Sequence, residues 1–427
     1  MKLSKIEKRT FLLLMISTFF NAMIGSLSNI QDIISKKALH ALDWQLTLLA
    51  MVWPLSNFIS IWWGKVLEHS KHKARYFLLV AILGRLVLIF GMWVVNMNQF
   101  LILLTFMFSF SSLLIPATNA IYQENISPMN RGRIFGYTVS LTTLAAMVIS
   151  FFAGRLLDQN EHSFHMILMA AGISGFLSAF VLSLVKFDKN YQRPQLDSMT
   201  PREILYTPIK RMMEILKTNK EFAKFERNFS AYGMGFIMLQ PVIPIYLVQN
   251  LQLNYTYNFL GKGILSQYGF LILSPIIGKL HDKFHPHKFT AISFGALTTY
   301  PLMFLLSYFV HDRFWAILLV YIAFVLFGVA MTGVNISWNM GTIFFAGKGE
   351  SPMYQSVHVT MTGLRGVVAP LLGLFLLRTC GIASVFLVAT LFLILASWLS
   401  RRDYKNFQCK SEVECVPENL NLLNPNG

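Results

Sequence analysis

The chain has 427 residues, of which 55% are hydrophobic and 13% are charged, and its net charge is +16. Apolar runs of about 20 residues, each long enough to cross a ~30 Å hydrocarbon core, recur along its whole length. This composition excludes a soluble globular protein and indicates an integral membrane protein.

Twelve apolar segments are predicted to cross the membrane. Because backbone polar groups must be satisfied within each segment in lipid, all twelve are expected to be helices, which gives an all-α polytopic fold. The segments cover residues 11–33, 44–64, 75–95, 99–121, 133–154, 164–186, 229–250, 260–280, 289–310, 314–340, 354–377 and 382–399.

The 36 lysines and arginines are unevenly placed. Most lie at the N-terminus, in the connections after even-numbered segments and in the C-terminal tail, whereas few lie in the alternate connections. The positive-inside rule therefore predicts that both termini are cytoplasmic, in the plasma (inner) membrane. Since the charge is explained by topology, no nucleic-acid partner is expected.

The cysteines and the N-terminus carry no special signal. Cys380, Cys409 and Cys415 lack the spacing of a metal site, and no metal or cofactor is expected. The first apolar run is longer than the core of a usual signal peptide and is interpreted as the first membrane segment.

Polar and small residues lie on one helical face in segments one, four and ten, and prolines interrupt segment seven. Such faces are expected to contact protein or a water-filled path, since lipid solvates them poorly. The residues concerned are Asn21, Gly25, Ser28, Asn29 and Asp32; Thr105, Ser109, Ser112, Pro116, Asn119 and Gln123; Gln240, Pro241 and Pro244; and Gly328, Thr332, Asn335 and Asn339.

A basic motif follows the second segment and is repeated half a chain later. The first copy runs from Gly64 to Arg75 and the second from Gly278 to Lys288, each with a glycine, an aliphatic residue, an acid and a basic cluster. Internal repeats in an apolar chain are typical of transporter folds.

The repeat predicts a domain organisation of two six-helix bundles, residues 1–186 and 229–400. Residues 187–228 form a cytoplasmic linker, in which Thr200 to Glu203 reads as a capping box that starts an amphipathic helix on the inner leaflet. Residues 401–427 are expected to form a polar, disordered cytoplasmic tail.

The twelve segments, their division into six plus six and the repeated motif together resemble the major facilitator superfamily over essentially the whole chain. The resemblance implies that segments one, four, seven and ten line a central cavity, and that a monomer works by alternating access. The family motif G-x-L-x-D-R-x-G-R-R is matched by Gly64, Val66 and Glu68, and again by Gly278, Leu280 and Asp282.

Two arginines lie near the membrane midplane, where each costs about 2.5–3.5 kcal/mol to insert. Arg365 is the better candidate for binding an anion, since segment eleven borders the cavity in the family, and Arg85 has packing as its alternative role. For the amide side chains of the cavity, the alternative role is to form hydrogen bonds between helices. The predicted substrate-binding residues are Arg365, Asn21, Asn29, Asn119, Gln123, Gln240, Asn335, Asn339 and Arg85.

Gating and proton coupling have their own candidates. A cytoplasmic latch that forms in one conformational state is predicted at Gly64, Glu68, Arg131, Arg133, Gly278 and Asp282, with solvated loop charges as the alternative. Proton coupling needs a titratable group in the pathway, and the candidates are Asp32, Glu124 and His358. Because no acid was located at mid-depth, facilitation and exchange stay open.

The resulting hypothesis is a secondary active or facilitative transporter of a small solute, either an organic anion or an amphiphile such as a drug. No phosphate-binding glycine loop is present, and a membrane-embedded transferase is disfavoured because the histidines gather mainly in the basic motifs. The protein is therefore not expected to be an enzyme. A transporter-like sensor that binds solute without flux is the remaining alternative.

Overall fold

The computed structural model describes residues 3–69, 73–187, 201–346 and 351–414. The chain is 90% helical, its described part contains no strand, and its helices are consistent with twelve membrane segments, so the predicted fold class is confirmed. Within the described residues, nine helical segments are long and apolar enough to cross a membrane. The protein is an integral membrane protein.

The first half of the chain forms seven helices joined by tighter helical turns. Their bounds are α1 Lys5–Lys37, α2 Asp43–His69, α3 Lys73–Leu79, the π-helix η1 Val80–Arg85, the 3₁₀-helix η2 Leu86–Trp93, α4 Met97–Ser111, α5 Leu114–Asn125, α6 Pro128–Gln159, the short 3₁₀ turn η3 Glu161–Ser163 and α7 Phe164–Ser183.

The second half begins with the linker helix α8 Pro201–Thr218. The remaining elements are α9 Lys220–Ile237, α10 Val242–Ile245, η4 Tyr246–Asn250, α11 Tyr255–Phe259, η5 Leu260–Leu265, α12 Ser266–Lys283, α13 Pro286–Leu297, α14 Thr299–Phe309, α15 Arg313–Met340, η6 Gly341–Phe344, α16 Ser351–Cys380 and α17 Ile382–Glu414.

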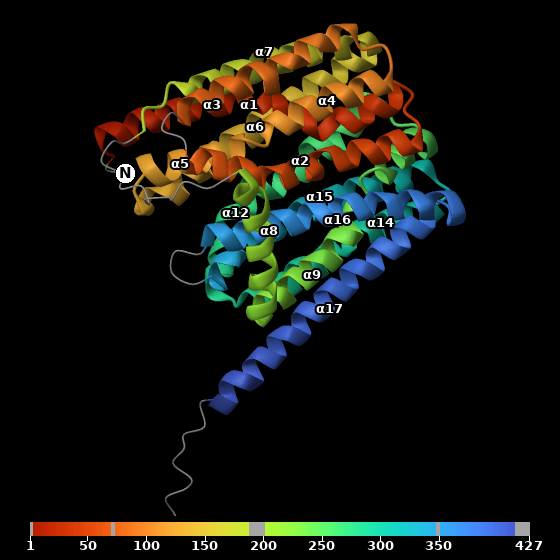
Figure 1. The fold of residues 1–427 in the computed structure, drawn as a ribbon. Coiled ribbons are helices and arrows are strands. Elements are labelled where there is room, and N and C mark those ends of the chain that lie inside the picture. The colour runs from red at the N-terminus through yellow and green to blue at the C-terminus, as the bar shows by residue number, and fades with distance from the viewer. Residues whose placement is uncertain (1–2, 70–72, 188–200, 347–350, 415–427) are drawn as a thin grey trace, which may run out of the picture.

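Figure 1 shows the helices α1 to α7 as one group and α9 to α17 as a second group beside it, with α8 running across them. The linker helix contacts α2, α9 and α16, so it touches both groups. We call the end with the short connections 38–42, 160–163, 251–254 and 310–312 the turn end, and the opposite end, where α1 starts and α17 finishes, the terminal end.

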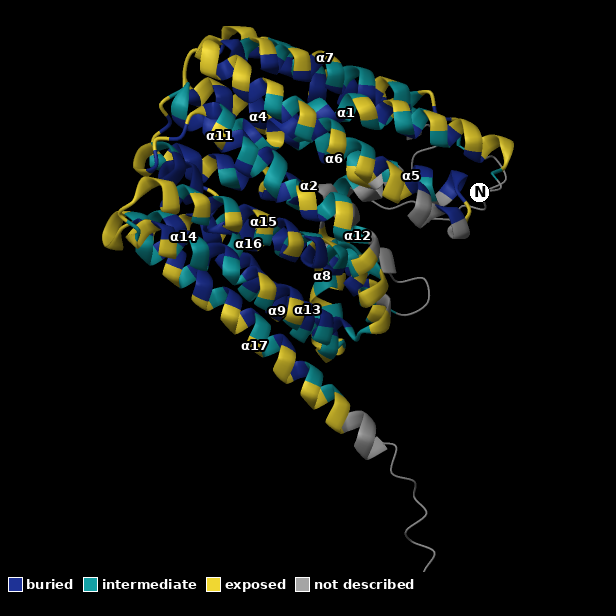
Figure 2. Cartoon of the chain, turned by 180° about the vertical axis from the view of Figure 1, so that it is seen from behind, coloured by how far each residue is buried: buried dark blue, intermediate teal, exposed yellow. Residues whose placement is uncertain are grey.

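The outer faces of both groups are apolar. In Figure 2 many exposed residues lie along the outward sides of the helices. Large apolar side chains that are exposed include Ile102 (67%), Phe152 (62%) and Phe314 (68%). Large apolar side chains exposed in such number are unfavourable in water and favourable in lipid. The exposed surface therefore indicates the part of the molecule that the bilayer covers.

Two helices are interrupted near prolines, and one of these breaks, in segment seven, was predicted. Segment seven divides into α9, which ends at Ile237, and α10, which begins at Val242, with Pro241 between them. Segment four also divides, into α4 and α5, shortly before Pro116. Proline lacks the N–H that continues the helix ladder, which explains a bend or break at these positions.

Glycines allow the two halves to pack closely along their seam. A Cβ on Gly366 of α16 would overlap Pro54 of α2, and a Cβ on Gly263 of η5 would lie 2.6 Å from the Cβ of Ser150 on α6. Lipid tails are as apolar as core side chains, so membrane helices associate through close packing of small residues. The most extensive contacts across the seam are made by two helix pairs, α2 with α16 and α6 with α11–α12.

Two expected boundaries differ from the structure. The last helix continues past Arg401 to Glu414, because Asp403 is buried and accepts hydrogen bonds from Arg227 (2.6 Å) and Asn228 (2.8 Å) of α9. The expectation of disorder from residue 401 is thus wrong as far as Glu414. Helix α9 also starts earlier than residue 229, at Lys220, since Asn219 caps it by accepting from the N–H of Phe222.

Candidate functional site

One carboxylate joins the two halves at the turn end. Asp158, near the end of α6, accepts hydrogen bonds from the backbone N–H groups of Tyr255 (2.7 Å) and Thr256 (2.9 Å). These residues begin α11, where backbone donors have no partner within the helix and the positive end of the helix dipole favours an acid. The side chain of one half therefore caps a helix of the other half.

Lys37 adds a second contact between the halves at the same end. Its Nζ donates a hydrogen bond to the carbonyl oxygen of Leu253 at 3.3 Å and lies 4.2 Å from the centroid of the Tyr255 ring, a cation–π geometry. Together with Asp158, this lysine closes the seam at the turn end.

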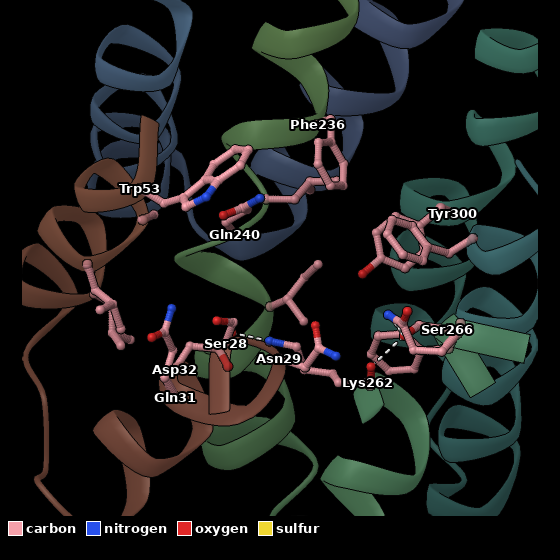
Figure 3. A pocket seen from close by; sticks show the side chains of 18 residues that line it. Ser28, Asn29, Gln31, Asp32, Trp53, Phe236, Gln240, Lys262, Ser266 and Tyr300 are labelled. Atoms are coloured by element: carbon pink, nitrogen blue, oxygen red, sulfur yellow. Dashed lines mark hydrogen bonds and ion pairs between the residues drawn. The ribbon is translucent and has the colours of Figure 1, made fainter. Parts of the chain in front are cut away.

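A cavity of about 250 Å³, here called the central cavity, lies in the seam. Figure 3 shows Trp53, Phe236 and Gln240 along one side and Asn29, Asp32 and Lys262 along the other. Its polar lining residues come from both halves and are Ser28, Asn29, Gln31, Asp32, Gln240, Lys262, Ser266 and Gln267. Its aromatic lining residues are Trp53, Phe236, Tyr300, Phe324 and Phe327.

An ion pair crosses the central cavity wall. Asp32 of α1 accepts from the Nζ of Lys262 in η5, so the two charges belong to opposite halves of the chain. Their side chains are 19% and 18% exposed, respectively. Charges held inside a membrane protein are costly unless paired and commonly mark solute or ion pathways.

The local sequence explains why Lys262 reaches the seam. It lies in the π-helix η5 between two glycines, and π-helices occur frequently at functional sites. A Cβ on Gly261 would lie 2.7 Å from the Phe324 ring, and one on Gly263 would collide with Ser150. Since neither neighbour has a side chain, the backbone around Lys262 packs directly against α15 and against α6 of the other half.

The central cavity also contains an amide oxygen without a partner. Gln31 Oε1 is buried and accepts no hydrogen bond within the described residues. By contrast, Gln267 Nε2 donates to Ser266 Oγ at 3.2 Å. Buried polar atoms in proteins normally have a partner, so the free Gln31 oxygen is a candidate acceptor for a ligand donor.

The sequence-predicted residues separate into two groups. Asn29, Gln240 and Asp32 line the central cavity, whereas Asn21 of α1 does not. In α15, Asn339 Nδ2 donates to the carbonyl and side-chain oxygens of Asn335, both at 2.9 Å, and neither residue lines the cavity. The part that the structure describes leaves out the surroundings of seven predicted residues, which are Gly64, Glu68, Asn119, Gln123, Arg131, Arg133 and Asp282.

Sequence reasoning missed Lys262 as a site residue, although it is a charge flanked by glycines inside an apolar segment. It also missed a buried acid, Glu226, because segment seven was expected to begin three residues after it. In the structure the carboxylate of Glu226 is 1% exposed.

Glu226 forms a second polar cluster, inside the second half and away from the central cavity lining. Its Oε1 lies 2.6 Å from Nδ1 of His358 on α16, and His358 is fully buried. Glu226 Oε2 and His358 Nε2 have no hydrogen-bond partner within the described residues. The pair therefore has sites available for one more proton or hydrogen bond.

Arg365 lies on the same helix as His358 and is 4% exposed. Its Nη2 donates to Thr362 Oγ1 at 2.5 Å, and its guanidinium carbon lies 5.7 Å from the centroid of the Phe229 ring. Its Nε and Nη1 have no partner within the described residues. A Cβ on Gly233 of α9 would overlap the arginine side chain, so this glycine makes the space that Arg365 fills.

Two other candidates are buried but lie elsewhere. Arg85 ends the π-helix η1 and is 7% exposed, and its Cδ would be 3.1 Å from a Cβ placed on Gly175 of α7. Glu124 is buried in α5. Neither residue lines the central cavity.

Comparison with known proteins identifies the family. The sequence model of the Major Facilitator Superfamily matches residues 10–364, so the chain belongs to this family of membrane transporters. No curated protein matches the chain in sequence.

Several solved structures share the fold. A mutant of the nucleoside transporter NupG has a TM-score of 0.73 and 15% identity, and the match covers 92% of this chain and 100% of that one. A POT family transporter in complex with a thioalcohol-conjugated peptide has a TM-score of 0.71 and 14% identity, with 92% and 95% coverage. A D-xylose–proton symporter has a TM-score of 0.64 and 11% identity, with 92% and 95% coverage.

Proposed function

We propose that this transporter binds its small solute in the central cavity and moves it by alternating access. The observation that carries the proposal is the cavity in the seam, lined by polar groups of both halves and crossed by the Asp32–Lys262 ion pair. Movement of one half against the other would change every one of these contacts at once. The solute site would then open to each side of the membrane in turn.

The halves that move are proposed to be residues 1–186 and 229–400, in a monomer. The seam supports one closed end: at the turn end a Cβ on Gly154 of α6 would lie 3.0 Å from Thr256 Cα. Toward the terminal end of the same helix pair, a Cβ on Gly136 or Gly278 would meet no atom of the described residues within 4 Å. This pattern fits a conformation closed at the turn end and separated at the terminal end.

The basic residues favour a cytoplasmic terminal end, in the plasma (inner) membrane. With this orientation the conformation faces the cytoplasm. The latch at Gly64, Glu68, Arg131, Arg133, Gly278 and Asp282 remains a proposal for the gate at this end. Asp282→Asn is expected to slow transport while solute binding stays nearly unchanged, and loss of binding alone would argue against a latch.

The Glu226–His358 pair supports proton coupling. A carboxylate and an imidazole 2.6 Å apart in a buried site can share one proton, and uptake or loss of a proton by the pair changes its net charge. Such groups in transporters commonly carry protons. Asp32, which pairs with Lys262, is a further candidate for proton coupling. An organic anion bound at Arg365 would require access to this buried cluster from the central cavity.

The test is uptake of a labelled solute panel into proteoliposomes, with and without an imposed pH gradient. We expect flux of at least one solute, increased by an inward proton gradient. Flux that ignores the gradient would contradict proton coupling and favour facilitation or exchange. Binding without flux of any solute would contradict transport and favour the sensor alternative.

A further inference from the structure

The charges of the central cavity indicate the chemical class of the solute, an inference that rests on the proposed function. We propose that the cavity binds a zwitterionic solute with an apolar body, such as an α-amino acid. The solute ammonium group takes the place of Lys262 beside Asp32, and the solute carboxylate takes the place of Asp32 beside Lys262.

Charge balance separates the solute classes. Removing one partner from a buried ion pair leaves an uncompensated charge and is strongly unfavourable. A monoanion would pair with Lys262 and leave Asp32 alone, and a monocation would do the reverse. A neutral solute would leave the pair intact. As long as Asp32 and Lys262 are both ionised, only a solute with both charges can separate them and compensate both of them.

The pair also has the right position for coupling binding to movement. Asp32 lies on α1 and Lys262 on η5, so each solute charge binds a different half of the protein. A ligand shifts a conformational equilibrium only through different interactions in the two states. Replacing a direct bond between the halves by two bonds to the solute supplies such a difference.

A purely structural tie is the alternative role of this pair. The turn end is already tied by Asp158 and Lys37, and these contacts lie outside the cavity lining. Asp32 and Lys262, by contrast, both line the cavity, and their side chains are 19% and 18% exposed. An exposed face toward a cavity is what a ligand needs and a structural tie does not.

The other lining groups fit the two ends and the body of such a solute. The unpartnered Oε1 of Gln31 accepts a hydrogen bond from an ammonium group. Trp53, Phe236 and Phe327 supply apolar walls. The volume of about 250 Å³ lies at the small end of ligand pockets, which favours a single amino acid over a long peptide.

The experiment is isothermal titration calorimetry of the full-length protein in detergent. The probes are leucine and phenylalanine, their N-acetyl derivatives, their amides, uridine and xylose. We expect the zwitterions to bind about tenfold or more tightly than either singly charged derivative. Equal binding of the derivatives, preferred binding of uridine or xylose, or no binding of either zwitterion would overturn the proposal.

Transport of the same panel in proteoliposomes separates this inference from the proposed function. Uptake of uridine or xylose without uptake or binding of zwitterions would overturn the solute class and leave transport intact. Zwitterion binding without uptake of any solute would leave the solute class intact and contradict transport.

Variants test the role of the pair itself. The double variant Asp32→Asn with Lys262→Met removes both charges, so no lone charge is left buried, and it is expected to weaken zwitterion binding about tenfold or more. The matched control is Asp43→Asn, which breaks the Lys36–Asp43 pair (3.1 Å) outside the cavity lining and should leave binding unchanged.

A misfolded double variant is recognised by its elution on size-exclusion chromatography. In that case the charge exchange Asp32→Lys with Lys262→Asp keeps an ion pair across the seam. It should restore binding of the same zwitterions. An assembled double variant that binds zwitterions as tightly as the unmodified protein would overturn the proposal.

Discussion

Glu226 and His358 share a hydrogen bond of 2.6 Å between α9 and α16, and neither is exposed by more than 1%. Glu226→Gln removes the carboxylate, so His358 loses the acidic group with which it shares a proton, and an imidazolium left there would be a buried charge without a partner. We therefore expect Glu226→Gln to reduce gradient-driven uptake about tenfold or more, as for other general acid–base groups. The measurement is initial uptake rate at fixed solute concentration, with and without a pH gradient.

The matched control for this substitution is Glu214→Gln, on the exposed face of the linker helix α8. It removes the same charge and should leave the gradient response intact. A Glu226→Gln variant that responds to the gradient like the unmodified protein would remove this pair from the coupling mechanism.

The tie at the turn end predicts a change in accessibility. Asp158→Ala removes the acceptor for the first N–H groups of α11, which should favour opening of the turn end. We expect faster reaction of an Ala50→Cys probe in the central cavity with a membrane-impermeant maleimide added at that end, after Cys380, Cys409 and Cys415 are replaced by serine.

Asp312→Ala provides the control for this experiment. Asp312 also caps a helix, accepting from the N–H of Trp315 at 3.1 Å, but both residues belong to the second half. Loss of a cap alone therefore cannot change the seam. Equal labelling rates in the Asp158 and Asp312 variants would show that the tie does not control access.

Packing around Arg365 predicts a stability difference between two glycines. Gly233→Ala places a methyl group where the Arg365 side chain lies, and such overpacking typically costs about 1–3 kcal/mol. Gly278→Ala meets no atom within 4 Å and should leave thermal stability unchanged. Thermal unfolding in one detergent compares the two. A Gly233→Ala variant as stable as the Gly278→Ala variant would contradict the described position of the arginine.

His285, in the connection between α12 and α13, predicts a pH effect on stability. Burial lowers the pKa of its imidazole from the usual 6.5, and the charge of Glu221 opposes this only in part. The unfolded chain therefore binds a proton before the folded protein does, so stability should fall as the pH drops below about 6.5.

The variant His285→Phe tests this effect. The ring centroids of His285 and Phe407 are 4.2 Å apart. An aromatic replacement therefore keeps the ring contact and removes the group that binds a proton. The difference in melting temperature between pH 8 and pH 5 should become smaller in the variant. An unchanged difference would assign the pH dependence to other groups.

The sequence predicted the class of fold because the apolar segments and the basic connections are local patterns with strong physical causes. The prolines at 241 and 244 similarly predicted where segment seven would break. The end of α17 was not predictable in this way. Its polar sequence is typical of a tail, and the contacts that Asp403 makes with α9 and Phe407 with His285 are to residues far away in sequence.

The candidate site shows the same limit. Helical spacing identified Asn29 and Asp32, and the prolines of segment seven drew attention to Gln240 beside them; all three residues line the central cavity. Helical spacing could not show that Asn335 and Asn339 bond to each other, or that Arg365 fills the space beside Gly233 inside one half. The spacing of polar residues predicts that they share one face of a helix. The residues that lie opposite that face depend on how all the helices pack.

The cap that Asp158 places on α11 also affects how the protein tolerates substitution. Its partners at residues 255 and 256 are main-chain N–H groups, which every amino acid except proline supplies. Residue types at those two positions can therefore vary without weakening the bond, while position 158 must keep a side-chain acceptor. Pairwise covariation between the two ends of this contact should therefore be absent even though the contact joins the two halves of the protein.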